Sequence, residues 1–499
     1  MFQYLDLDKL SILFKYDEWD PLLFSTAFFL FLFFFLLIAY RFLSNNKTSR
    51  VLLLLVFSFF FYYKVSGLFF LLLILTSFIN YYAAISIGLA KAPGLKKSLV
   101  VLGIIFNVAL LGYFKYTNFF LQIINDFSIA QLDPLEILLP IGISFYTFKA
   151  ISYLVEVYWE NIEPEKNFLD FTLYISFFAN ILAGPIDRAN AFLPQVKQAP
   201  ELRKAEIGTA LYLILAGLFK KVVIADYISI NFVDRIFDSP LRYTGVENLL
   251  GIYGYALQIY CDFSGYTDMA MGIALLLGFK LMENFNSPYK AASVADFWRR
   301  WHISLSTWLL DYLFRPLQMK FRNLRTLGNA SALLITFILC GFWHGASWTF
   351  IFWGALHGFF MAFAILTAKP RKAFFTRLKL EDSKLLKGIR VFITFHLIAA
   401  AWVFFRVADF QSGLDVFNQI FTFFQGEVFM QFVEAYPVIL GLIILGYILH
   451  FLPKSLEIKT AEIIARTPVA AQAFLLAVMM WLAAQSKSAD LQPFIYFQF

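Results

Sequence analysis

The sequence contains few of the residues that build disulfide-stabilised folds or metal centres. Only two cysteines occur in 499 residues, Cys261 and Cys340, and both lie in apolar stretches. They provide neither a disulfide framework nor the closely spaced ligand pairs of a zinc site. Histidine is also scarce, with five residues, which are His302, His344, His357, His396 and His450. We therefore expect no bound metal and no fold that depends on disulfides.

The sequence also lacks the motifs of several common enzyme classes. The nearest match to the GxSxG nucleophile elbow, at 262–266, has neither glycine in the required place. No HExxH zinc motif and no Walker loop occur. No histidine is followed five residues later by aspartate, so the His-x4-Asp arrangement of soluble acyltransferases is missing. These absences exclude ordinary hydrolase, metalloprotease and ATPase functions.

Long apolar runs dominate the composition. The chain is 60% hydrophobic and 20% aromatic, with 63 phenylalanines. A soluble protein of this size needs more polar residues than that to cover its surface. Phe28–Ile38 and Val438–Leu449 are continuously apolar. A β-barrel would need short segments of alternating polarity instead. Because a helix satisfies its own backbone in lipid, we expect an all-α integral membrane protein.

The apolar segments predict a polytopic protein. A helix needs about 20 residues to cross the hydrocarbon core, so the shorter segments must be half-spans or tilted. We expect about eleven crossings in a single membrane domain over 1–499, with no internal repeat. The segment 331–366 is long enough for two short helices, with a break near Gly345. The expected spans are 22–42, 51–63, 66–88, 98–116, 138–157, 169–184, 207–230, 247–278, 331–366, 389–407, 434–451 and 470–485.

Loop charges predict an orientation in the membrane. Basic residues gather in 41–50, 91–97 and 368–390, which we therefore place in the cytoplasm. The acidic loop 408–436 and the acidic leading segment, with Asp6, Asp8, Asp17, Glu18 and Asp20, then lie outside. The leading segment lacks the basic region of a signal peptide, so we expect the first span to remain as an anchor. The net charge of +7 is explained by cytoplasmic loops and gives no reason to expect nucleic-acid binding.

His344 is the strongest candidate for a catalytic residue. It lies in LCGFWHGASWTFIFWGALHG, and an ionisable residue at such a depth is costly and often functional. Its side chain suits proton transfer near neutral pH. Gly341 and Gly345 leave room for another backbone or a substrate chain. The alternative is a neutral histidine bonded to a neighbouring helix, and depth favours the functional interpretation.

His302 lies in DFWRRWHISLSTWLLDYLFRP, beside Arg299 and Arg300. Phe297, Trp301, Trp308 and Tyr312 form an aromatic stripe at helical spacing. Aromatic and basic residues together suit a membrane interface, where His302 would face lipid head groups. The arginines could equally receive the phosphates of an acyl carrier. Both interpretations stay open.

Polar residues also interrupt the apolar stretch YALQIYCDFSGYTDMAMGIALLLGF. Asp262, Ser264, Tyr266 and Asp268 lie there, and buried carboxylates need partners. We expect Asp262 to pair with Arg299 or Arg300 in preference to binding substrate hydroxyls.

The remaining histidines and the cysteines have weaker claims to a function. His357 lies thirteen residues after His344 and would point away from it on a straight helix, so we do not pair the two. His396 and His450 are expected to be packing or interface residues. Cys261 and Cys340 are expected to be small buried hydrophobes and not acyl carriers.

Long motifs between Leu139 and Phe499 resemble one known family. These motifs, and the order in which they occur, are similar to those of the bacterial branch of the membrane-bound O-acyltransferases. Within that branch they are most similar to proteins that O-acetylate alginate and other cell-surface glycans. The motifs are PIGISFYTFKAISYLVEVY, LAGPIDRA, YALQIYCDFSGYTDMAMGIALLLGF, NFNSPY, DFWRRWHISLSTW, LCGFWHGASWTFIFWGALHG and the terminal PFIYFQF.

The resemblance implies a fold and roles for particular residues. It implies a ring of tilted helices around a thinned centre, with a tunnel that joins the two faces. His344, in Trp-His-Gly, matches the essential histidine of the family, and His302, in Arg-Arg-Trp-His, matches a second one. Leu310 stands where relatives often have arginine, and Phe314–Gln318 replaces their usual YIPLGG. These departures concern donor-side or loop contacts and not the histidines.

The sequence thus predicts O-acetyl transfer in the bacterial cytoplasmic membrane. The donor would be acetyl-CoA or another acyl thioester from the cytoplasm, with no permanently bound cofactor. A periplasmic protein related to SGNH hydrolases would receive the acetyl group or pass it to an exported polysaccharide. His344 would act as general base, and His302 would orient the acceptor or donate to the carbonyl oxygen. The candidate substrate-binding residues are Trp343, Arg299, Arg300, Asp262 and Tyr266.

Two alternatives remain at this point. Within the same family, the chain could transfer D-alanine to teichoic acid. From another class, it could move an acyl group or a glycan without chemistry, although transporters are often built from repeated halves that this sequence does not show.

Overall fold

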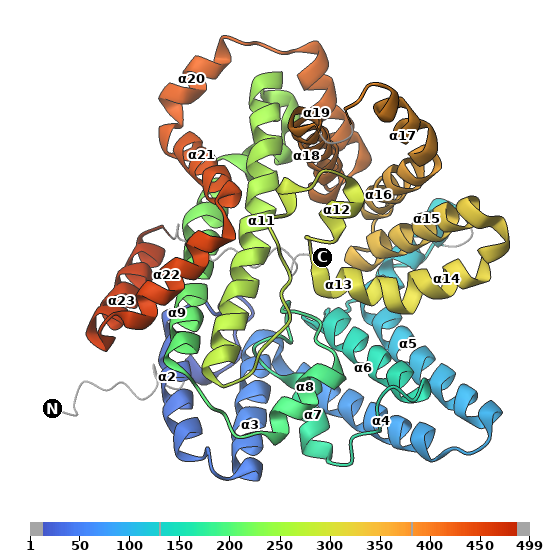
Figure 1. The fold of residues 1–499 in the computed structure, drawn as a ribbon, viewed down its shortest axis with the longest axis vertical. Helices are drawn as coiled ribbons and strands as arrows, with labels where there is room; N and C mark the ends of the chain where they lie inside the picture. The colour runs from blue at the N-terminus through green and yellow to red at the C-terminus, as the bar shows by residue number, and fades with distance from the viewer. Residues whose placement is uncertain (1–12, 129–130, 381–382, 487–499) are drawn as a thin grey trace. The chain divides into compact units, whose positions relative to one another are not determined.

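A computed structural model describes residues 13–128, 131–380 and 383–486. Every regular element in these ranges is a helix, which confirms the all-α prediction (Figure 1). The contacts divide the chain into two compact units. Unit 1 comprises Met1–Ile214, Asp268–Met282 and Ala461–Leu476, and unit 2 comprises Leu215–Thr267, Glu283–Thr460 and Ala477–Phe499. The expectation of a single domain over 1–499 stays a prediction. The terminal PFIYFQF motif, Asp6 and Asp8 lie outside the described residues.

Unit 1 contains most of the helices from the first half of the chain. Side-chain caps set where several of them begin: Thr26 accepts a hydrogen bond from the Phe29 N–H, and Asn46 accepts one from the Ser49 N–H. Gly67 has a φ of 57° and separates two helices, a conformation that glycine adopts without steric cost. The helices are α2 (Ala27–Phe42), α3 (Lys47–Ser66), α4 (Phe70–Leu89), α5 (Pro93–Asp126), α6 (Ile143–Tyr158), α7 (Phe168–Ser176) and α8 (Ala189–Lys197).

Four helices continue from one unit into the other. They are α9 (Lys204–Leu218), α11 (Gly245–Leu276), α22 (Lys454–Arg466) and α23 (Val469–Ser486). The remaining elements of unit 2 are η2 (Phe219–Asp226), η3 (Ser229–Val233), α10 (Asp234–Asp238), α12 (Val294–Trp298), α13 (Ile303–Leu309), η6 (Leu310–Phe314), α14 (Arg315–Lys320), α15 (Arg325–His344), α16 (Trp348–Leu366), α17 (Ala368–Arg377), α18 (Lys384–Arg406), α19 (Phe410–Thr422), α20 (Val428–Ala435) and α21 (Pro437–Phe451), with short 3-10 turns between them.

The chain is a multi-pass membrane protein. When spans are counted by helix length and composition, there are fewer of them than expected. Six helical stretches in the described ranges are long and apolar enough to span, or seven if α20 and α21, bent by 94°, count as one. About eleven crossings are therefore not confirmed. The segment 169–184 shows one reason, because its helix α7 ends at Ser176 and the chain then turns through Gly184 and Pro185.

The predicted break near Gly345 is confirmed, and it produces the packing that matters most for the site. Helix α15 ends at His344, the chain reverses, and α16 packs back along α15 (Figure 1). A Cβ atom on Gly341 would lie 2.2 Å from the Phe350 carbonyl oxygen, and one on Gly354 would lie 2.2 Å from that of Phe337. Glycine at these two positions lets the helix backbones touch.

Unit 1 holds a buried polar network around the LAGPIDRA motif. The Lys149 ammonium on α6 donates to Asn180 Oδ1 at 2.6 Å and to the Tyr174 carbonyl at 3.1 Å. The Asn180 amide donates to Asp187 Oδ2 at 2.8 Å, and the Met282 N–H donates to Asp187 Oδ1 at 2.9 Å. Because both carboxylate oxygens and the ammonium have partners, the network fixes the irregular segment 177–188 against α6.

Candidate functional site

His344 lies at the centre of an aromatic cluster in unit 2. It is the last residue of α15, and its side chain is buried. Its ring centroid lies 4.8 Å from that of Trp343, 5.0 Å from Trp353 and 5.4 Å from Phe405. The space that Gly341 and Gly345 were expected to leave is occupied by α16, since a Cβ on Gly345 would lie 2.1 Å from the Phe350 ring. The glycines therefore serve helix packing, and aromatic rings surround the imidazole.

His302 lies in the same unit, between α12 and α13, and its side chain is fully buried. It does not face head groups at a surface, as the interfacial interpretation required. Its φ of 44° is unusual for a residue with a side chain and persists only where the surroundings hold it. Here the Ile303 N–H donates to the Asn284 carbonyl and the Ser304 hydroxyl to the Asn284 side chain. These bonds fix the chain that directly follows His302.

Trp343 connects the two histidines. Its ring lies 6.4 Å from that of His302 and 4.8 Å from that of His344. The Phe263 ring covers His302 from α11, at 4.7 Å and nearly perpendicular to it. His302 lies outside the candidate spans, and burial lowers the pKa of its imidazole well below the ordinary value. A neutral imidazole of this kind donates one hydrogen bond and accepts another.

We did not pair His357 with His344 because the two would diverge on a straight helix, and the structure shows that the assumption of a straight helix was wrong. The reversal at Gly345 places α16 beside α15, so Trp353 contacts both imidazoles, at 5.0 Å from His344 and 4.9 Å from His357. The Trp298 indole donates to His357 Nδ1 at 3.2 Å, which places the proton of a neutral ring on Nε2. The predicted helix break was the signal that could have found this contact.

On α16, two N–H groups of the cluster have no acceptor within the described chain. They are His357 Nε2 and Trp353 Nε1, and both side chains have an exposed fraction of 0%. Trp353 and His357 lie four residues apart on one helix and therefore share a face. A buried donor without a partner is costly in a folded protein. This pair can therefore receive an oxygen atom of a ligand beside His344.

The predicted pairing of Asp262 is also wrong. Asp262 contacts the Lys221 ammonium at 2.5 Å, and Lys221 also contacts Asp226 at 2.8 Å. Lys221 lies close to α11 because Gly265 has no side chain. A Cβ atom at Gly265 would lie only 3.0 Å from the backbone nitrogen of Lys221. A buried lysine flanked by two carboxylates is a structural ion cluster.

The arginines have a nearer partner. Arg299 and Arg300 both pair with Asp296, at 3.7 and 3.1 Å, because residues three and four positions apart meet on one helical turn. The Arg299 side chain is 73% exposed and lies away from the buried centre. Tyr266 is buried on α11, one turn after Phe263, and Trp343 lines the centre itself.

The other candidates belong to the packing of the fold. His450 accepts a hydrogen bond from the Tyr289 N–H at 3.1 Å, and His396 shares one with the Tyr253 hydroxyl at 3.0 Å. Cys261 and Cys340 are both buried thiols. Within the described ranges, no three His, Cys, Asp or Glu residues gather as metal ligands would.

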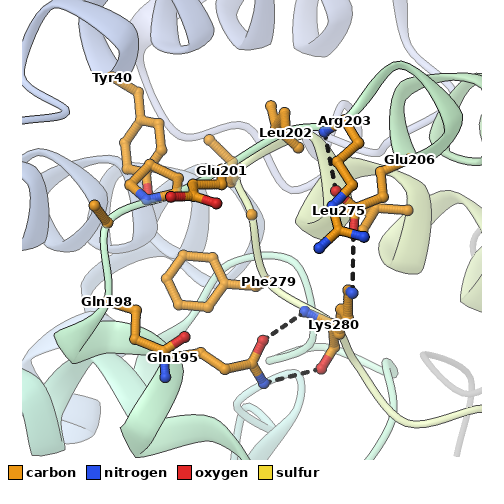
Figure 2. Close-up of a pocket in the computed structure, with 14 residues that line it drawn as sticks. Tyr40, Gln195, Gln198, Glu201, Leu202, Arg203, Glu206, Leu275, Phe279 and Lys280 are labelled. Atoms are coloured by element: carbon orange, nitrogen blue, oxygen red, sulfur yellow. Dashed lines mark hydrogen bonds and ion pairs between the residues drawn. The ribbon is translucent and has the colours of Figure 1, made fainter.

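Unit 1 contains a cavity of about 620 Å³ that none of the predicted site residues lines. Figure 2 shows that some of its polar groups, those of Gln195, Glu206 and Lys280, bond to neighbours in the lining. The Lys280 ammonium pairs with Glu206 at 2.9 Å, and the Gln195 amide bonds to both backbone groups of Lys280. Because none of the predicted site residues lines this cavity, the aromatic cluster of unit 2 stays the candidate site.

Known proteins resemble this chain over a large part of its length. It is 39% identical to the peptidoglycan O-acetyltransferase of Helicobacter pylori over 367 residues, which are 68% of this chain and 67% of the relative. It is 37% identical to the probable alginate O-acetylase AlgI of Pseudomonas aeruginosa over 356 residues, which are 69% of this chain and 64% of the relative.

A third relative is less similar. The chain is 29% identical to the teichoic acid D-alanyltransferase of Bacillus subtilis over 277 residues, which are 54% of this chain and 69% of the relative. A family model described as MBOAT, membrane-bound O-acyltransferase family, matches residues 57–406. The match covers most of the chain and contains His302, Trp343 and His344. The chain therefore belongs to the membrane-bound O-acyltransferase family.

Proposed function

We propose that this protein moves an acetyl group from a cytoplasmic acyl thioester across the bacterial cytoplasmic membrane for O-acetylation of an exported or cell-surface polysaccharide. Relatives named for peptidoglycan and alginate acetylation support a polysaccharide acceptor. The observation that carries the proposal is the contact of both His302 and His344 with Trp343 in a buried aromatic site. Residues distant in sequence thus meet where acyl transfer needs a base and a second polar group.

The proposed chemistry begins at His344. Its imidazole accepts the proton of an acceptor hydroxyl as that oxygen attacks the carbonyl carbon of the thioester. The carbon–sulfur bond then breaks, and the thiolate leaves and takes up a proton. His302 orients the acceptor or donates to the carbonyl oxygen. Aromatic rings around His344 keep water away, so the thioester is transferred and not hydrolysed.

Two further groups support the developing negative charge on the carbonyl oxygen. Trp353 Nε1 and His357 Nε2 are buried donors without a partner in the described chain, and the Trp353 ring contacts His344. Preorganised N–H groups of this kind stabilise an oxyanion strongly in a site without water. The Trp298 indole keeps the His357 proton on Nε2, where it can donate.

The earlier substrate-binding candidates divide by their surroundings. Trp343 contacts both histidines and fits a contact with the acyl group or the acceptor. Tyr266 is buried on α11, one turn after the Phe263 that covers His302, and stays a candidate for such a contact. Asp262 is held by Lys221, so its contribution is to fix α11. Arg300 and the exposed Arg299 would contact only an outer part of a ligand.

The proposal includes a tunnel within a ring of tilted helices, an N-terminus outside and an SGNH-like periplasmic partner. Family membership supports the ring and the tunnel. Orientation is tested by maleimide labelling of Ser383→Cys, expected inside, and Ser412→Cys, expected outside. The two native cysteines are buried and should label slowly. Labelling of both sites from the same face would contradict the orientation.

The substrate is tested with purified protein in proteoliposomes. Transfer of label is compared for an acetyl thioester and for a D-alanyl carrier, with and without a co-encoded SGNH-like protein and a polysaccharide. We expect acetyl transfer alone, and none in the His302→Ala/His344→Ala double variant. Preferred D-alanyl transfer would favour the function named for the Bacillus subtilis relative. Movement of substrate that survives loss of both histidines would identify a transporter.

A further inference from the structure

A second cavity lies in unit 2, away from the histidine cluster along the chain. Its volume is about 470 Å³. It lies between the loop that precedes α12, helix α17 and the first turns of α18. The lining residues are Ala292, Ser293, Ala368, Arg371, Lys372, Phe375 and Arg390. Three of these seven are cations and none is acidic, which gives the cavity a strongly positive lining.

Among the described residues, no carboxylate pairs with the three cations that line the cavity. In the described chain, no ion pair involves Arg371, Lys372 or Arg390. The nearest acid on the wall segment, Asp296, is held by Arg299 and Arg300. The cavity of unit 1 differs in this respect, because its Lys280 pairs with Glu206 (Figure 2). A cavity that gathers uncompensated cations attracts an anionic ligand.

The two guanidinium groups are held in place without carboxylates. Arg371 donates to the Ala364 carbonyl at 2.6 Å and to the Thr367 carbonyl at 3.4 Å, at the C-terminal end of α16. Arg390 lies over the Phe375 ring, 5.1 Å from its centroid. Each guanidinium has five N–H donors, so these contacts leave donors available. Groups fixed in this way lose little entropy when they bind a ligand.

We infer that Arg371, Lys372 and Arg390 form a binding site for a phosphate ester. Guanidinium groups match phosphate geometry with paired hydrogen bonds, and the lysine adds a third charge. Phe375 offers an apolar face to the organic part of the ligand. The sequence places the basic segment 368–390 in the cytoplasm, where phosphate esters occur on acyl carriers and on anionic lipids.

The position of the cavity connects it with the proposed chemistry. Ala292 and Ser293 form part of its wall and lead directly into α12, whose Trp298 bonds to His357. If the phosphate belongs to the acyl donor, the cavity anchors the carrier end of the thioester; this assignment rests on the proposed function. If it belongs to a lipid head group, the cavity anchors the enzyme to an anionic membrane. Both sources share the phosphate chemistry.

The test measures binding without turnover, so that it is independent of the proposed reaction. Full-length protein is placed in phosphatidylcholine nanodiscs and titrated separately with coenzyme A and with short-chain phosphatidylglycerol. The variant Arg371→Ala/Arg390→Ala should bind one of these probes about tenfold or more weakly than wild type. The wild-type affinity should also fall as salt is raised. Size-exclusion profiles and melting temperatures confirm that each variant is folded.

The matched control is Arg377→Ala/Lys384→Ala. It removes two cations from the same basic segment, but neither residue lines the cavity. We expect it to bind both probes like wild type. Weakened coenzyme A binding assigns the site to the donor, and the Michaelis constant for the thioester should then rise with little change in kcat. Weakened phosphatidylglycerol binding assigns it to lipid. The inference is overturned if wild type binds neither probe, if the cavity variant binds both normally, or if the control loses as much affinity.

Discussion

Unit 1 and unit 2 each bury polar side chains, but they do so in different ways. In unit 1, Lys149, Asn180 and Asp187 satisfy one another and nearby backbone groups. In unit 2, His302, His344 and His357 are packed among aromatic rings, and the donors of His357 and Trp353 have no acceptor in the described chain. A polar network whose members all have partners fixes the backbone around it. A buried donor without an acceptor can instead bond to a ligand. The two regions should therefore respond to substitution in opposite ways.

The largest effect is expected for Asp187→Ala in unit 1. The change removes the acceptor of the Asn180 amide and of the Met282 N–H, and each buried donor left without a partner should cost about 1–3 kcal/mol of folding free energy. Thermal unfolding of purified protein, with yield after membrane extraction, measures this loss. Asp187→Asn retains the shape and some hydrogen bonds and should lose less. An Asp187→Ala protein with wild-type melting temperature and yield would show that the network is not structural.

His302→Asn should produce a smaller effect, on activity and not on folding. Asparagine tolerates the positive φ at this position, so the backbone is retained while the imidazole is lost. Proton transfer or orientation by a positioned group is worth 10²-fold or more, so we expect acetyl transfer to fall by about 10²-fold. His302→Gly controls for backbone strain alone. Full activity in a well-folded His302→Asn variant would return His302 to a packing role.

Trp353→Phe should reduce transfer about tenfold, because one N–H is lost while an aromatic ring remains. The loss should appear in kcat and not in the Michaelis constant, since the donor acts on the developing oxyanion. Trp402→Phe is the matched control. Trp402 stacks on Trp353 at 5.5 Å, and its described ring contacts do not include His344. Equal losses in the two variants would mean that aromatic packing, and not the Trp353 N–H, matters.

The smallest effect is expected for the Glu165–Lys197 pair of unit 1, whose atoms lie 2.7 Å apart. Burial acts to raise the pKa of Glu165, but the Lys197 ammonium and the Asn167 N–H outweigh it and leave the pKa below its ordinary value. Hydrogen bonding to Glu165 raises the pKa of Lys197. The pair therefore stabilises the fold above the unfolded pKa of the carboxyl and below the unfolded pKa of the lysine.

Stability from this pair should be lost as pH falls through the folded pKa of Glu165, or rises through that of Lys197. Because Lys197 is half exposed, its replacement by methionine should cost less than about 1 kcal/mol. Melting temperatures of Lys197→Met and wild type between pH 4 and pH 7 measure the difference. The two curves should converge as the pH falls, and a gap that widens toward pH 4 would contradict the sign.

Local patterns predicted the helices and singled out His302 and His344 as candidates, because apolar periodicity and isolated polar residues are properties of short segments. The break at Gly345 was visible for the same reason. The partner of Asp262 was not, since Lys221 approaches only where helices pack at Gly265. Arg299 and Arg300 pair with Asp296 and not with Asp262, because Asp296 lies only three and four residues before them on the same helical turn.

The contact of His357 with the site is a tertiary consequence of the reversal between α15 and α16. A straight-helix estimate placed His357 far from His344, whereas the hairpin brings both against Trp353. The left-handed backbone at His302 was equally invisible, because no glycine or turn motif marks it. Residues that act together in this site are joined by packing between helices, which spacing along the chain does not record.

The most direct test of the account is the single-turnover rate of acetyl transfer by His344→Ala in proteoliposomes. The variant should insert and purify as wild type does, and its melting temperature and size-exclusion profile show whether it is folded. Its rate should fall by about 10²–10⁴-fold, since the base that activates the acceptor hydroxyl is missing. A correctly folded His344→Ala protein that transfers acetyl groups at the wild-type rate would contradict the central claim.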